Sequence, residues 1–131
     1  MKSKLEVYAL SVCFAAVVCL VVSAGIGGYA LIRIVQPELT LEKWDYDKYQ
    51  SNDVFWQTRQ QRNLEGQKAE QRPAEEDLTK RRLESYSRAL MTERRGGVQT
   101  LIRSAIFFLA GAVSLFVHWR IARRARQDIR T

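Results

Sequence analysis

The sequence predicts an all-α membrane protein with two transmembrane helices that form a hairpin around a charged, largely helical extramembrane loop. Two long stretches, residues 7–32 and 104–119, contain no Asp, Glu, Lys or Arg. Between them, residues 34–97 contain as many acidic as basic residues. Apolar residues make up 47% of the chain and charged residues 27%, but both values average these opposite kinds of segment. Such a distribution excludes a soluble globular enzyme.

The first transmembrane helix is expected at residues 7–33, after a short N-terminus of residues 1–6. A bilayer core about 30 Å thick needs roughly 20 helical residues, and this apolar run is longer. A signal peptide is the alternative, because Lys2 and Lys4 form a positive start and Ala24 precedes a possible cleavage point at Gly25. The apolar part of a signal peptide is normally only about 7–15 residues long. We therefore expect the helix to be uncleaved.

The second transmembrane helix is expected at residues 98–119. Residues 104–119 alone are short for a span, and adding 98–102 places Arg103 about one turn inside the membrane. The guanidinium of Arg103 can extend back to the lipid headgroups along its own apolar stem.

The basic residues predict an orientation with both termini in the cytoplasm. Residues 120–131 form an Arg-rich tail, and the N-terminus brings two lysines. Cytoplasmic loops carry the excess of Lys and Arg, so the chain is expected to be a multi-pass protein with residues 34–97 on the opposite side of the membrane. Lipid headgroups rather than nucleic acid are the expected partner of the tail arginines, since these sit directly beside a membrane helix. They are Arg120, Arg123, Arg124 and Arg126.

Small residues recur at intervals of four along the first helix. The ladder consists of Ser11, Ala15, Cys19, Ser23 and Gly27. Small side chains let a second backbone approach closely, which drives helix association inside a bilayer. The ladder is expected to pack on the second helix, and an alternative is that it docks a helix of another protein. Both can hold.

The loop of residues 34–97 is predicted to begin with an aromatic segment. Pro37 should end the first helix, because proline lacks the amide donor and restrains the preceding residue. Trp and Tyr favour the membrane–water interface, so an interfacial or partner-binding role is expected for the aromatic residues. They are Trp44, Tyr46, Tyr49, Phe55 and Trp56. Ser51 and Asn52 are expected to cap a short helix that begins at Asp53.

A charged helix is predicted from Pro73 to the pair Gly96 and Gly97. Proline suits the first helical position, acidic residues follow it at the positive helix end, and glycine is typical of a helix stop. Residues 57–97 contain few large aliphatic side chains, which is too few for an independent core. A solvated helix is therefore favoured over one that binds a partner.

No arrangement of residues predicts catalysis, a cofactor or a metal site. Cys13 and Cys19 lie in the apolar run, where cysteine behaves as a small hydrophobe. His118 is the only histidine, so a catalytic triad or a metal cluster cannot be built around it within this chain. A haem carrier that uses this histidine is a remote alternative. A small-molecule substrate is not expected either.

Several short stretches resemble small hypothetical inner-membrane proteins of bacteria. They comprise residues 8–14, 25–29, 37–40, 50–53 and 55–56. The resemblance covers the first helix and the start of the loop. It implies a bacterial membrane location and no catalytic activity.

These observations predict a small non-catalytic integral membrane protein that acts as an accessory or structural subunit of a larger membrane protein. The alternative is a self-associating envelope protein with a periplasmic interaction helix. Membrane lipids and either another integral membrane protein or a second copy of the chain are the expected partners.

Overall fold

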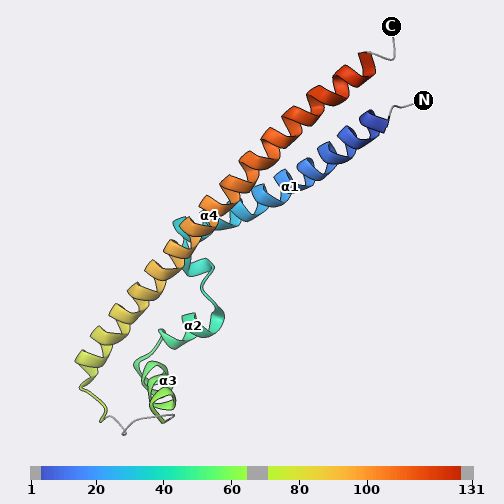
Figure 1. Ribbon diagram of the computed structural model, residues 1–131. Helices are drawn as coiled ribbons and strands as arrows, with labels where there is room; N and C mark the ends of the chain where they lie inside the picture. The colour runs from blue at the N-terminus through green and yellow to red at the C-terminus, as the bar shows by residue number, and fades with distance from the viewer. Residues whose placement is uncertain (1–3, 65–70, 128–131) are drawn as a thin grey trace. The chain divides into compact units, whose positions relative to one another are not determined.

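The computed structural model describes residues 4–64 and 71–127, and their side chains over 4–61 and 71–125. These residues are nearly all helical. The elements are α1 (Lys4–Val35), the 3-10 helix η1 (Pro37–Leu39), α2 (Lys43–Lys48), α3 (Asn52–Leu64) and α4 (Glu75–Gln127) (Figure 1). Both α1 and α4 contain windows apolar enough to cross a membrane, with mean hydropathies of 2.6 and 2.0. The predicted all-α class is confirmed, while the hairpin and the membrane crossing stay predictions.

The helix α1 ends where the sequence predicts it, before Pro37. α1 ends at Val35, and Gln36 still donates its amide to the carbonyl of Ile32 at 2.8 Å. Pro37 then opens the 3-10 helix η1, because a proline can begin a helical turn but cannot continue the preceding one.

The start of α3 is also close to the prediction. The helix begins at Asn52, one residue earlier than expected. Ser51 caps it: its hydroxyl accepts the amide of Val54 at 3.3 Å, and its carbonyl accepts the amide of Phe55 at 3.1 Å.

The predicted helix stop at Gly96 and Gly97 is wrong, because α4 continues from Glu75 through both glycines to Gln127. A glycine inside a helix costs about 1 kcal/mol relative to alanine. Unbroken backbone hydrogen bonding offsets that cost here, and the apolar residues that follow favour a helix. The start also differs, since Pro73 lies two residues before the first helical residue rather than at it.

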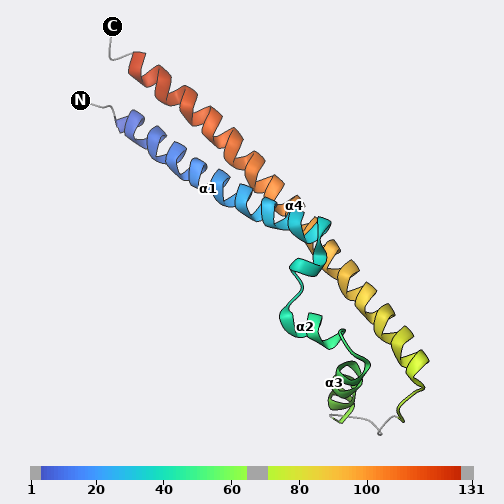
Figure 2. The same ribbon diagram turned by 180° about the vertical axis from the view of Figure 1, so that it is seen from behind.

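The chain forms two compact units. Unit 1 joins residues 1–31 to residues 98–131, and unit 2 is Ile32–Gly97. In unit 1, α1 lies beside the C-terminal part of α4, as the blue and the orange-to-red helices show in both views (Figure 1 and Figure 2).

The contacting face of α1 is narrow and made largely of small residues. Buried along it are Glu6, Ala9, Cys13, Ala16, Ser23 and Ala30. Half-buried Leu20 and Gly27 complete a series of alternating three- and four-residue steps. That heptad spacing averages 3.5 residues, so it stays on one face of a helix over many turns. We call these eight residues the α1 seam.

The opposing face of α4 also depends on small residues. Ser104, Gly111, Ala122 and Ala125 are buried there. A Cβ atom added to Gly111 would lie 3.2 Å from Cγ of Leu20 and 3.5 Å from the carbonyl oxygen of Ala16. The missing side chain of Gly111 therefore lets the backbone of α1 approach closely.

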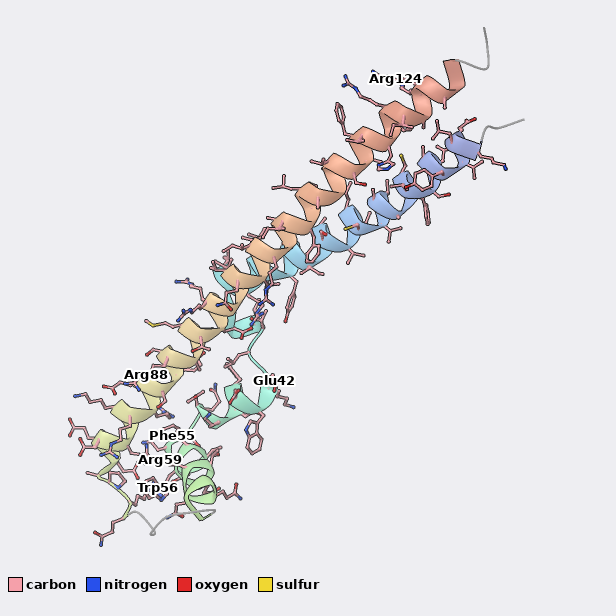
Figure 3. The ribbon with its side chains drawn as sticks, viewed as in Figure 1. Glu42, Phe55, Trp56, Arg59, Arg88 and Arg124 are labelled. Atoms are coloured by element: carbon pink, nitrogen blue, oxygen red, sulfur yellow. The ribbon has the colours of Figure 1, made fainter. Side chains whose placement is uncertain are left out.

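Unit 2 has a small apolar core of its own. Phe55, Trp56 and Leu78 are buried, and the half-buried ring of Tyr49 packs against them. Leu78 is only 1% exposed. Figure 3 labels Phe55 and Trp56 on α3, next to the N-terminal part of α4. The loop therefore does form a core, because aromatic residues before Gln57 pack against an aliphatic residue of the charged helix.

Polar contacts surround this core and fix the start of α4. The side-chain amide of Asn52 donates to Oε2 of Glu75 at 2.9 Å and to Oγ1 of Thr79 at 2.8 Å. Arg72 pairs with both Asp53, at 2.7 Å, and Glu75. The hydrogen bonds from Asn52 and Arg72 lower the pKa of the Glu75 carboxyl. These contacts join α3 to the first turn of α4.

Candidate functional site

The predicted ladder of small residues is divided between two faces of α1. Ser23 is buried and Gly27 half-buried in the α1 seam, where a Cβ added to Gly27 would lie 3.0 Å from Oγ of Ser104. Cys19 is half-buried at the edge, with its sulfur 3.9 Å from the carbonyl oxygen of Phe107. Ser11 and Ala15 are exposed. The structure therefore gives only part of the ladder to the contact with α4.

Helix geometry explains the division. A step of four residues turns about 400°, so each rung is displaced by about 40° from the one before. Four steps displace the last rung by about 160°, which carries Gly27 to nearly the opposite side from Ser11. A ladder spaced by four cannot remain on one face for this length.

Only Ser23 and Gly27 of the eight α1 seam residues belonged to the predicted ladder. Ala9, Cys13, Ala16 and Ala30 are buried but were not part of the ladder. The signal was present in the sequence, because small residues also recur at alternating three- and four-residue steps from Ala9 to Ala30. Among the small residues between positions 105 and 114 of α4, Gly111 is buried and Ala112 and Ser114 are half-buried, while Ala105 and Ala110 are exposed.

The predicted aromatic surface is smaller than expected. Trp44 is 65% exposed and Tyr46 is 40% exposed, so both can contact an interface or a partner. Phe55 and Trp56 are in the core of unit 2, at 5% and 6% exposed, so their side chains face that core. The two residues are adjacent near the start of α3 and pack against Leu78 of α4. Tyr49 is half-buried against the same core.

The arginine tail lies on the last turns of α4. The guanidinium of Arg120 stacks 4.8 Å from the ring centre of Phe116, and that of Arg123 lies 5.7 Å from the Trp119 ring. Arg124 is exposed (Figure 3). Such cation–π contacts orient the arginines beside aromatic rings. The side chain of Arg126 lies outside the described residues.

A polar clasp within unit 2 holds the end of α1 against α4. Arg33 pairs with Glu93 through two hydrogen bonds, from Nε at 2.7 Å and from Nη2 at 3.0 Å. The Nε atom of Arg94 donates to the carbonyl of Ile34 at 3.0 Å. This carbonyl is among the last of α1, which have no partner within their own helix, so Arg94 caps α1 from outside. We call these four residues the clasp.

Gly96 gives the clasp room. A Cβ added to it would lie 2.7 Å from Nη2 of Arg33, so any larger residue displaces the guanidinium. The missing side chain of Gly96 thus leaves space for the guanidinium of Arg33 beside α4. Sequence reasoning treated Arg33 only as the bracket of a membrane span, and no local pattern relates it to Glu93, sixty residues away.

The electrostatics of the clasp favour an ionised Glu93. The two side chains of the ion pair are only 22% and 19% exposed, so water screens them incompletely. The hydrogen bond from Arg33 lowers the pKa of the Glu93 carboxyl below its ordinary value of 4.5, although partial burial opposes the shift.

This pairing predicts a pH dependence for unit 2. A carboxyl with a lowered pKa in the folded state stabilises the fold above its unfolded-state pKa, and the effect is lost as pH falls through the folded-state value. We expect Glu93→Gln to destabilise unit 2 at neutral pH by on the order of 1 kcal/mol, as for a hydrogen bond to a charged group. The difference from wild type should shrink below about pH 4. Amide hydrogen exchange of unit 2 measures it.

Glu84→Gln is the matched control, since Glu84 is exposed on the same helix. It should leave hydrogen exchange unchanged at both pH values. An effect of Glu93→Gln that is equally large in acid and at neutral pH would contradict the role given to the ionised pair.

The described metal-ligating side chains are scattered rather than clustered. Within residues 4–64 and 71–127, no three His, Cys, Asp or Glu side chains gather closely enough to share a metal ion. Nδ1 of His118 lies 2.9 Å from the carbonyl oxygen of Ser114. The centres of the His118 and Tyr8 rings lie 6.2 Å apart, in an edge-on arrangement. These contacts are sufficient to explain His118 as a packing side chain.

Comparison with protein-family models, with curated proteins and with solved structures yields no match to this chain.

Proposed function

We propose that the chain is a two-span protein of a bacterial cytoplasmic membrane, with both termini in the cytoplasm and the spans paired as a hairpin. It acts without catalysis, as an accessory or structural subunit of a larger membrane protein. Its partners are membrane lipids and that protein, rather than nucleic acid or a small-molecule substrate.

The observation that carries the proposal is the exposure of the apolar helices. In the most apolar window of each long helix, only 22% and 11% of the residues are buried. Phe14 is 73% exposed and Leu109 is 64% exposed, among many such side chains. A core helix of a soluble protein buries its apolar surface, whereas a helix that is apolar all round is typical of a lipid-facing span. Lipid is therefore the surrounding that fits these helices best.

The ends of unit 1 support the proposed orientation. The last turns of α4 carry exposed Arg120, Arg123 and Arg124, and two of these arginines stack on aromatic rings. Aromatic residues and arginines together are typical of a helix end at the headgroups, and the excess of basic residues marks the cytoplasmic side.

The accessory role is supported by small residues that α4 leaves uncovered. Ser11 and Ala15 are exposed, on the side of α1 opposite the seam. A Cβ added to Gly25 or Gly28 would meet nothing within 4 Å. Small residues exposed in a membrane helix allow the close approach of a further helix. Trp44 adds an exposed aromatic anchor in unit 2.

Reporter fusions test the orientation. With both termini in the cytoplasm, alkaline phosphatase fused after Thr131 should be inactive, and a fluorescent protein fused there should be bright. Intact mass should show an uncleaved N-terminus. An active phosphatase would reverse the orientation, and a mature protein that begins at Gly25 would remove the hairpin.

Leucine substitutions test the accessory role. If the chain is an accessory subunit, crosslinking in native membranes should capture the same partner protein each time. Ser11→Leu and Ala15→Leu add bulk on the exposed side of α1, so we expect both variants to lose this crosslink. The stability of unit 1 should stay unchanged, because neither residue lies in the α1 seam. Val113→Leu is the control, because Val113 is 63% exposed on α4 rather than on α1, and lipid accepts Leu as readily as Val. Crosslinks between copies of the chain alone would instead favour the self-associating envelope protein. Retention of the partner by both variants would reject this docking face.

A further inference from the structure

Arg103 is a single cation in an otherwise uncharged part of unit 1, because residues 98–119 of α4 contain no other Asp, Glu, Lys or Arg. Its side chain is exposed, and among the described residues the structure gives it neither a hydrogen bond nor an ion pair. Large apolar neighbours are exposed around it, with Ile106 at 61% and Phe107 at 60%. A counterion for Arg103 therefore has to come from outside the described chain.

The position of Arg103 is inside the apolar segments of both helices of unit 1. On α4 it follows Val98, where the segment begins, by about 7.5 Å along the helix axis. On α1, Gly27 is level with Ser104, because a Cβ added to Gly27 would lie 3.0 Å from Oγ of Ser104. Uncharged residues of α1 continue beyond this level to Ile32. If unit 1 spans a bilayer, the backbone of Arg103 lies in the hydrocarbon, close to one edge.

Helix geometry directs the guanidinium of Arg103 toward that edge. Side chains of a helix lean toward its N-terminus, which for Arg103 is the direction of Val98. The uncharged residues 104–119 extend about 24 Å, roughly 6 Å less than a typical hydrocarbon core. An arginine side chain extended toward the edge makes up this difference and brings its guanidinium to the level of the lipid phosphates.

The surroundings of this guanidinium favour an anionic group with an attached hydrocarbon chain. Residues 7–32 of α1 and 94–119 of α4 contain no Asp or Glu that could compete for Arg103. Gln99, four residues earlier on the same face of α4, is exposed and adds a side-chain amide donor nearer the edge. Ile106 and Phe107 follow Arg103 on the opposite side, toward the middle of the segment. A phosphate on Arg103 thus lies at the edge, and its hydrocarbon chain can extend inward over apolar side chains.

We propose that Arg103 binds the phosphate of an anionic phospholipid whose acyl chain lies along Ile106 and Phe107. The inference rests on the proposed membrane location. It provides a lipid contact at the edge of the membrane opposite the arginine tail. This contact also sets how deep the second span sits in the bilayer, because the phosphate holds Arg103 at the level of the headgroups.

The test compares phosphatidylglycerol with phosphatidylcholine as neighbours of the full chain. The protein is reconstituted in phosphatidylcholine vesicles that contain a minor fraction of either lipid with the same photoreactive acyl chain, and crosslinked peptides are mapped by mass spectrometry. We expect phosphatidylglycerol to label residues 102–110 roughly fivefold more than phosphatidylcholine does. This factor corresponds to about 1 kcal/mol for one basic residue near an anionic surface.

Arg103→Leu should remove this preference, so that both lipids label residues 102–110 equally. The variant remains suited to insertion, because leucine makes the span more apolar. Arg88→Gln is the matched control, since it removes an exposed arginine of α4 that lies outside the uncharged segment. It should keep the preference, and labelling at the arginine tail should be the same in all variants.

Two results would overturn the lipid site alone. One is an equal preference for phosphatidylglycerol at residues 102–110 in the wild type and in Arg103→Leu, and the other is no preference in the wild type. Failure of the wild-type chain to float with the vesicles would instead overturn the proposed membrane location.

Discussion

Gly27→Leu should weaken the contact between α1 and α4 by about 0.5–2 kcal/mol, the usual range for lost packing between membrane helices. Even a single added Cβ would lie 3.0 Å from Oγ of Ser104, and Leu adds three more carbon atoms. Ser23→Leu should act in the same direction, because Ser23 is only 5% exposed in the α1 seam. Thermal unfolding in mild detergent, monitored through the loss of contact between α1 and α4, measures the effect.

Val21→Leu is the control for this series. Val21 is 67% exposed and lies away from the seam, so the larger side chain should change the unfolding temperature little. If the Gly27, Ser23 and Val21 variants and the wild type all unfold at the same temperature, close packing along the α1 seam does not hold unit 1 together.

Trp56→Ala should destabilise unit 2 by about 3–5 kcal/mol, which is typical of removing a large aromatic side chain from a core. The core is small, so Trp56 supplies much of its buried surface together with Phe55 and Leu78. A loss of this size approaches the whole stability of a small domain. We therefore expect α2 and α3 to lose their protection against amide hydrogen exchange.

Trp44→Ala removes the same side chain from a surface. Because Trp44 is 65% exposed, its loss should change the stability of unit 2 by no more than about 0.5 kcal/mol. The same variant should matter for partner binding if Trp44 is an anchor there. Equal loss of protection in the two tryptophan variants would mean that the core is not where the structure places it.

Helices were predictable from the sequence where local signals act alone. Pro37 interrupts the chain through its own covalent geometry, and Ser51 caps α3 with its own hydroxyl. The glycines at 96 and 97 mislead because their local preference for a helix end is overridden by tertiary contacts. Gly96 lies against the guanidinium of Arg33, which comes from another helix.

Contacts between distant residues were less predictable. The small residues of α1 indicate a packing face, but the interval of four selects a path that winds around the helix. The sequence suggested that Phe55 and Trp56 lie on a surface, because Leu78, which packs against them, belongs to a strongly charged helix. The clasp has no local signal, since Arg33 and Glu93 are brought together only by the fold.

During synthesis, α1 is complete well before the part of α4 that packs on it. Cys19 and Phe107, which approach each other at the edge of the α1 seam, are separated by 88 residues of chain. At a translation rate of about 5–20 residues per second, α1 emerges roughly 4–18 s before the segment that covers it. During that interval its small-residue face is open to any neighbouring helix. If α1 spans a membrane as proposed, a further helix present there competes for this face before the chain pairs with itself.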